Sequence, residues 1–219
     1  MKRVLPPLFV FGALLALSAR ADTYDLIIRG GKLLDGTGSP WRYADVAITG
    51  NRIVTVGHVP ADATAKRTVD AKGLYVAPGY IDPHSHAAEA LEAADRAGCK
   101  ALITQGITTA VINPDGGGPA DLVPQLKVIT QSRPGVNVVP LVGHNTARIT
   151  AMAYEERDPK SEEMEKMRGI VRAGMQAGAW GMSDGLFYQP ANHSKTEEVI
   201  DLAKIVAQYR GFYLSLIHI

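Results

Sequence analysis

Cysteine is nearly absent from this chain, since Cys99 is the single one among 219 residues. One thiol cannot close a disulfide within the chain, so the small secreted folds that depend on a disulfide framework are excluded. Cys99 lies in a helical pattern directly before a predicted strand. We therefore predict a buried structural thiol rather than a reactive one.

An excess of charge of one sign is also lacking. The 23 Lys and Arg residues nearly balance the 22 Asp and Glu residues, and the formal net charge is +1. No long basic run occurs, which argues against nucleic acid as a partner. Apolar residues make up 46% of the chain, which is an ordinary globular composition.

Long hydrophobic runs are lacking except near the start of the chain. Lys2 and Arg3 precede an apolar region over residues 4–17, and Ser18-Ala19-Arg20-Ala21 follows as an A-x-A cleavage site. A membrane-spanning helix needs about 20 apolar residues, which this run does not reach. We predict that residues 1–21 are a signal peptide cleaved after Ala21. The mature protein would be exported to the periplasm or secreted, without a stable membrane anchor.

Residues 22–73 have the pattern of short strands. Residues 24–29 and 44–49 are extended runs, and Gly50-Asn51 marks a two-residue hairpin turn. Residues 35–40 (DGTGSP) have the composition of a loop. This segment is predicted to form part of a small β-sandwich.

Strands and helices alternate over residues 74–219, which favours parallel βα units and an α/β fold. Helical stretches are predicted at 87–104, 120–132, 161–177 and 196–209, the last opening with a capping box at Ser194–Glu197. Five strands are predicted, at 74–82, 108–112, 136–142, 179–182 and 211–215. A complete (β/α)8 TIM-type barrel needs about 250 residues, so we predict an incomplete barrel with about five of its eight strands.

Two histidines follow the first of these strands. In an extended chain, alternate side chains point to one face, so Asp82, His84 and His86 would lie on the same side. Two imidazoles on one face can bind a single cation, and zinc accepts such nitrogen ligands. A pair of unrelated histidines in a turn is the alternative for this pattern taken alone.

The segment around these histidines, residues 77–86 (APGYIDPHSH), resembles the end of the first barrel strand in the amidohydrolase superfamily. Within that superfamily the nearest resemblance is to the D-aminoacylases, the N-acyl-D-amino-acid deacylases. It runs from about Thr23 to Tyr213. Four further stretches occur in the family's order: residues 24–31 (YDLIIRGG), 105–109 (QGITT), 143–144 (GH) with Arg148, and 178–183 (GAWGMS).

The resemblance implies a metal-dependent hydrolase that cleaves the amide bond of small N-acyl-D-amino acids, with a divalent metal, zinc, as cofactor. His84 and His86 would be metal ligands. The family has a metal-binding cysteine nine residues beyond the glycine of its GITT motif, and counting from Gly106 places Asp115 there. A carboxylate can also bind zinc. The alternative is an ordinary turn aspartate before Gly116-Gly117-Gly118.

The same resemblance implies substrate-binding residues. It places His144 at the rim of the active site with Arg148 supporting the loop, and it suggests Ser183 and Tyr188 as substrate contacts. A hydrogen-bonded structural role is the alternative for His144. Many amidohydrolases carry a carbamylated lysine on strand four, and residues 179–182 contain no lysine, which fits the D-aminoacylase branch.

The family's remaining site residues have no counterpart here. Two histidine ligands on strands five and six and an aspartate general base on strand eight would lie beyond residue 219. Leu216 stands where the strand-five histidine belongs, and His218 comes two places late. We therefore expect this fragment by itself to bind metal weakly and to be inactive.

Two alternatives to the deacylase remain open. One is another amidohydrolase that acts on cyclic amides, similar to dihydroorotases or hydantoinases, which a lysine on strand four would have favoured. The other is a non-catalytic secreted binding module, which would be stable and soluble as this fragment.

Overall fold

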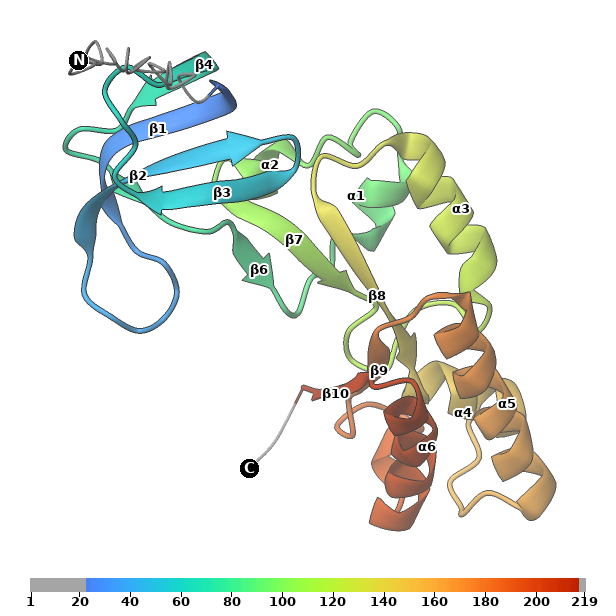
Figure 1. Ribbon diagram of the computed structural model, residues 1–219. Coiled ribbons are helices and arrows are strands. Elements are labelled where there is room, and N and C mark those ends of the chain that lie inside the picture. The colour runs from blue at the N-terminus through green and yellow to red at the C-terminus, as the bar shows by residue number, and fades with distance from the viewer. Residues whose placement is uncertain (1–22, 217–219) are drawn as a thin grey trace, which may run out of the picture. The chain divides into compact units, whose positions relative to one another are not determined.

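The computed structural model describes residues 23–216 and divides into two compact units (Figure 1). The first ends at Pro78 and the second begins at Gly79. The predicted signal peptide and His218 lie outside the described residues. Within the described part, none of the helices is long and apolar enough to cross a membrane.

The N-terminal unit is built on one sheet with the strand order β3-β2-β1-β4, to which β5 is added beside β1. The predicted hairpin is confirmed, because Thr49 of β2 pairs with Arg52 of β3 across Gly50-Asn51. Gly50 has a φ of 59°, which suits a tight turn. The strands are β1 (Thr23–Leu33), β2 (Arg42–Thr49), β3 (Arg52–Gly57), β4 (Thr64–Asp70) and β5 (Tyr75–Val76).

The single strand predicted over residues 74–82 is wrong. Tyr75–Val76 (β5) pairs with β1, whereas Tyr80–Asp82 (β6) pairs with β7 in the second unit. Pro78 separates the two pieces, and a proline has no N–H to donate to a strand partner. Gly79 allows the chain to approach the next strand closely, since a Cβ there would lie 2.2 Å from Thr108 Oγ1.

The C-terminal unit contains a curled sheet of five parallel strands in the order β10-β9-β8-β7-β6 (Figure 1). Each strand after β6 follows a helical segment, as βα units require. The predicted class, an α/β fold with an incomplete (β/α)8-type barrel, is confirmed over the described residues. A separate sheet precedes it in the chain, and its assignment as part of a β-sandwich stays a prediction. The strands are β6 (Tyr80–Asp82), β7 (Ile107–Ile112), β8 (Asn137–Gly143), β9 (Gly181–Asp184) and β10 (Phe212–Ser215).

The helices agree with the prediction except before β7 and after β8. Helix α5 has the predicted bounds, and its methionines Met164, Met167 and Met175 pack in the core against Val142 and Leu202. The helices are α1 (Ala88–Glu92), α2 (Lys100–Ile103), α3 (Leu122–Ser132), α4 (His144–Met152), α5 (Ser161–Ala177) and α6 (Thr196–Gln208), with a 3-10 turn at Ala191–His193.

The long helix predicted over residues 87–104 is broken into α1 and α2. Cys99 has a φ of 47°, which lies outside the helical region, and Ala97 turns its carbonyl to the amide of Gly135. The Cys99 side chain is buried as predicted, and burial raises the pKa of its thiol. Helix α4 was not predicted. Its buried face includes the polar residues His144 and Arg148, so the helical spacing of apolar residues that would indicate a helix is interrupted.

The capping box predicted at the start of α6 is wrong. The N-cap residue is Lys195, and no side-chain cap occurs there among the described residues. Ser194 instead donates its hydroxyl to the Glu198 carboxylate at 3.1 Å. The same Glu198 carboxylate also contacts His144 and Arg148, so the Ser194 hydroxyl joins a side-chain network rather than capping the backbone.

Candidate metal centre

His84, His86 and Asp115 converge at one edge of the parallel sheet. The two histidines follow β6 and the aspartate follows β7, which is the adjacent strand. His84 Nε2 lies 3.1 Å from Asp115 Oδ1, and His86 Nε2 lies 3.3 Å from Asp115 Oδ2. The three ligand atoms lie within 4.8 Å of one another. Because carboxyl ends of parallel strands carry the reactive groups of barrel enzymes, this is the expected place for a site.

One carboxylate oxygen in this cluster lacks a conventional partner. Asp115 Oδ1 is buried and accepts no hydrogen bond from any residue of the described part, although His84 Nε2 is near. Buried polar atoms are nearly always satisfied, and a buried carboxylate oxygen that faces two imidazole nitrogens can be satisfied by a shared cation. Two imidazole nitrogens and a carboxylate form a donor set that zinc accepts. The cluster therefore fits a divalent metal.

The exposure of the three side chains differs. Asp115 is mostly buried at 17%, His84 is 29% exposed, and His86 is 72% exposed. Ser85 between the histidines is buried and donates its amide to Val111 O at 2.9 Å. A buried Ser85 between two more exposed histidines is the alternation predicted from the sequence, although the strand itself ends at Asp82.

The loop that carries Asp115 has an unusual backbone. Asn113 and Asp115 both have left-handed φ values, 61° and 62°, which non-glycine residues rarely adopt. The side-chain amide of Asn113 donates from Nδ2 to Leu141 O at 3.2 Å and to Gln125 Oε1 at 2.9 Å. Asp115 therefore occupies a turn and also faces the two histidines, so the two readings do not exclude each other. Its role as a metal ligand stays a prediction.

Ser183 contacts this loop rather than open space. It lies in β9 and is fully buried. Its hydroxyl donates to Asn113 O at 2.6 Å and accepts from the Gly116 amide at 3.1 Å. The prediction that Ser183 touches substrate is wrong in this structure, because the hydroxyl has no exposed surface and its hydrogen is already used.

Tyr188 remains accessible. Its side chain is 43% exposed, and its ring packs edge-on against Phe187 with centroids 5.7 Å apart. It follows β9, on the connection that leads to the 3-10 turn. Contact between Tyr188 and a substrate stays a prediction.

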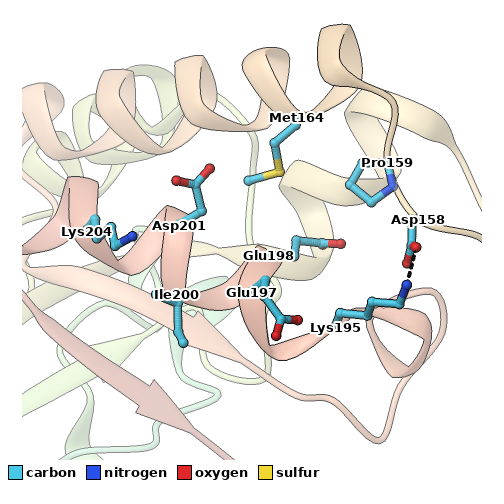
Figure 2. A pocket seen from close by; sticks show the side chains of 9 residues that line it. All are labelled: Asp158, Pro159, Met164, Lys195, Glu197, Glu198, Ile200, Asp201 and Lys204. Atoms are coloured by element: carbon cyan, nitrogen blue, oxygen red, sulfur yellow. Dashed lines mark hydrogen bonds and ion pairs between the residues drawn. The ribbon is translucent and has the colours of Figure 1, made fainter.

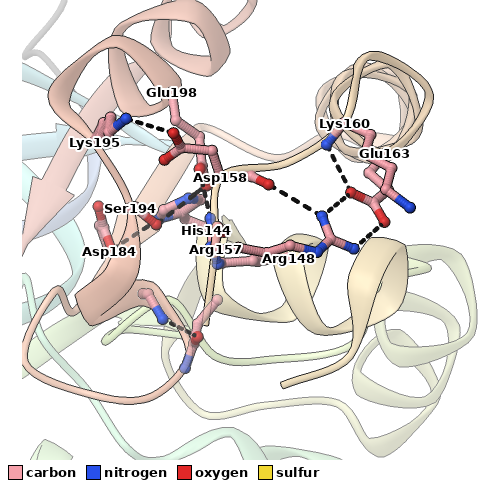
Figure 3. Close-up of polar contacts among 12 residues, drawn as sticks. His144, Arg148, Arg157, Asp158, Lys160, Glu163, Asp184, Ser194, Lys195 and Glu198 are labelled. Atoms are coloured by element: carbon pink, nitrogen blue, oxygen red, sulfur yellow. Dashed lines mark hydrogen bonds and ion pairs between the residues drawn. The ribbon is translucent and has the colours of Figure 1, made fainter. Parts of the chain in front are cut away.

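His144 is a core residue rather than a rim residue. The predicted position at the rim is wrong, since the first residue of α4 is 0% exposed. Its Nε2 lies 2.8 Å from Glu198 Oε1, and its Nδ1 lies 3.0 Å from Asp184 Oδ1 (Figure 3). The alternative prediction, a hydrogen-bonded structural histidine, describes this placement.

The histidine belongs to a buried ionic network that sequence reasoning missed in part. Arg148 Nη1 donates to Glu198 Oε2 at 2.5 Å, and Arg148 Nη2 donates to Arg157 O, which supports the loop before α5 (Figure 3). Tyr213 of β10 donates to Asp184 Oδ2 at 3.0 Å. The sequence does not mark Asp184 and Glu198 as buried. Acidic residues at the end of a strand or in the first turn of a helix are usually exposed.

The charges of this network are mutually stabilised. Burial alone would lower the pKa of His144, but the carboxylates of Asp184 and Glu198 outweigh burial and raise that pKa to about 9. A doubly donating imidazolium suits two carboxylates, whereas the neutral ring has only one N–H. Burial and the nearby Asp184 raise the pKa of Tyr213 to about 12, so the phenol remains a donor.

We expect the unfolding free energy to fall as the pH rises from 6.5 to about 9. The folded pKa of His144 lies above its unfolded value of 6.5, so its contribution is complete below pH 6.5 and lost as the pH passes 9. The loss is about 3 kcal/mol by proton linkage. Urea unfolding followed by helical circular dichroism measures it. A flat profile over this range would contradict the assignment, and the His144→Asn variant should lack the slope.

A second feature, a groove beside α6, lies away from the metal cluster (Figure 2). It has a volume of about 460 Å³ and is lined by Met164 of α5 and by Glu197, Asp201 and Lys204 of α6. Lys195 and Asp158 form an ion pair at one side. The groove lies between outer helices rather than at the strand ends, and its mixed charges select no ligand class.

Comparisons with known proteins find similarity over most of this chain. The sequence profile of the Amidohydrolase family matches residues 67–215. D-aminoacylase from Alcaligenes xylosoxydans xylosoxydans is 34% identical, over 89% of this chain and 44% of that protein.

Two solved structures are similar over most of this chain. A crystal structure of D-aminoacylase has a TM-score of 0.79 and 31% identity, over 87% of this chain and 44% of the other. N-acyl-D-glutamate deacylase from Bordetella bronchiseptica, solved with zinc and a phosphonate inhibitor, has a TM-score of 0.77 and 31% identity, over 89% and 45%. This chain therefore spans less than half the length of these relatives.

Proposed function

Because this chain belongs to the amidohydrolase family, we propose that it forms the metal-binding part of an enzyme that hydrolyses the amide bond of N-acyl-D-amino acids. The observation that carries the proposal is the convergence of His84, His86 and Asp115 at the ends of adjacent strands. The deacylase relatives support the reaction class, and they match across both units of the chain.

Zinc is the proposed metal. His84 and His86 would hold it through their Nε2 atoms and Asp115 through a carboxylate oxygen, and the zinc present in the Bordetella bronchiseptica deacylase supports this choice. When bound, a divalent metal supplies the Lewis-acid chemistry that amide hydrolysis needs. A carboxylate is a harder ligand than a thiolate and shifts metal preference toward harder ions.

The substrate is proposed to be a small molecule, with the exposed Tyr188 side chain as one contact. The general base and two further ligands are proposed to come from parts of the barrel other than strands β6 to β10. We also propose export of the protein, on the basis of the basic, apolar and A-x-A segments within residues 1–21.

The test measures hydrolysis of N-acetyl-D-amino acids and their L enantiomers by the protein at its full encoded length. We expect release of the free D-amino acid with at least a roughly tenfold preference over L, since a positioned polar contact is worth about 1.4 kcal/mol or more. Removal of metal by a chelator should abolish the activity and added Zn²⁺ should restore it. Hydrolysis of cyclic amides alone would favour the hydantoinase-like alternative, and stable binding without hydrolysis would favour a binding module.

A further inference from the structure

The loop that carries Asp115 is held at both flanks by a residue from a distant strand. Ser183 lies 70 residues beyond Asn113 and 67 residues beyond Gly116 in the chain. The Ser183 hydroxyl donates to the Asn113 carbonyl and accepts from the Gly116 backbone amide, which directly follows Asp115. Asp115 thus lies between the two backbone groups that one side chain bonds.

The conformation of the loop needs such support. Asn113 and Asp115 have left-handed φ values, which are costly for residues other than glycine and persist only where surrounding contacts enforce them. The loop also lies directly on neighbouring backbone. A Cβ at Gly143 would be 2.2 Å from Gly116 O, and a Cβ at Gly185 would be 2.8 Å from Asp115 O.

We propose that Ser183 is a positioning residue that orients the Asp115 carboxylate toward His84 and His86. The inference rests on the proposed metal site and adds a residue that does not itself touch the metal. Without the hydroxyl, the buried Gly116 amide loses this acceptor and the left-handed turn loses the bond that bridges its two sides. Asp115 would then leave the geometry in which Oδ1 faces His84 Nε2.

The test uses the protein at its full encoded length, as in the activity assay, with Co²⁺ as a visible probe of the site. Ser183→Ala is expected to weaken Co²⁺ binding by roughly 10- to 100-fold, the usual effect of removing a group that orients a metal ligand. The ligand-field absorption bands should also shift, which a general loss of stability would not cause. Thr146→Ala is the matched control, because Thr146 Oγ1 bonds Gly118 O of the same loop without flanking Asp115. Its affinity should change by less than about threefold.

A double-mutant cycle with Asp115→Ala separates positioning from other roles. If Ser183 acts through Asp115, adding Ser183→Ala to Asp115→Ala should not weaken Co²⁺ binding further. Additive losses, or wild-type affinity and spectrum in Ser183→Ala, would overturn the inference while leaving the metal site intact. Failure of the full-length wild-type protein to bind Co²⁺ would instead overturn the proposed metal site, and the inference with it.

If Ser183→Ala does not fold, hydrogen exchange of the wild-type Gly116 amide tests whether its bond to Ser183 is maintained. In the wild-type chain the Gly116 amide should exchange at least about 100-fold more slowly than a free peptide amide, because it is buried and bonded to Ser183. Addition of Co²⁺ should slow it further. Exchange at the free-peptide rate would show that the bond is not maintained, and the inference would be wrong.

Discussion

Replacing Glu198 with alanine is expected to lower the unfolding free energy of the C-terminal unit by about 3–5 kcal/mol. The carboxylate is 4% exposed and bonds both His144 and Arg148, whose side chains are 0% exposed. Its loss leaves the Arg148 guanidinium buried without a counter-ion, and arginine cannot give up its proton. Urea unfolding followed at 222 nm measures the effect, because all the described helices belong to this unit.

The matched control for this variant is Glu197→Ala. Glu197 is the adjacent carboxylate in the first turn of α6, and it is exposed. Its replacement should change the unfolding free energy by no more than about 0.5 kcal/mol. Equal losses in the two variants would show that the helix N-terminus, rather than the buried network, accounts for the effect.

Replacing His84 with alanine is expected to weaken Zn²⁺ binding by about 100-fold or more, which corresponds to about 3 kcal/mol. One of three converging ligand atoms is lost, and the Asp115 carboxylate stays partly buried without its nearest nitrogen. Competition with a chromophoric chelator measures the affinity. His58→Ala is the control, since His58 is exposed and outside the cluster. Similar affinities for the two variants would remove His84 from the site.

The metal-ligand candidates could be predicted because their signals are local. The spacing of His84 and His86 places both side chains on one face of any extended segment, and the structure confirms that they lie together. Asp115 was accessible only through resemblance and a residue count from Gly106. Its turn composition would have suggested a surface loop, and only the packing of β7 beside β6 brings it to the histidines.

The roles of His144 and Ser183 could not be read from local pattern. Both sit next to strand ends, where a substrate-binding position is a reasonable expectation. Their partners are far away in the chain, since Glu198 lies 54 residues beyond His144 and Gly116 lies 67 residues before Ser183. Burial reassigns both residues from substrate contact to support of the structure.

The amino-acid sequence by itself determined the alternation of strands and helices, the family and the histidine pair. These follow from hydrophobic period, turn residues and short motifs, each confined to a few neighbouring positions. Tertiary structure alone decided where Pro78 and Gly79 divide the two units, which carboxylates pair with His144 and Arg148, and how Ser183 holds the Asp115 loop. The reason is physical: a buried charge or hydroxyl is defined by its partners, and those partners come from other strands and helices.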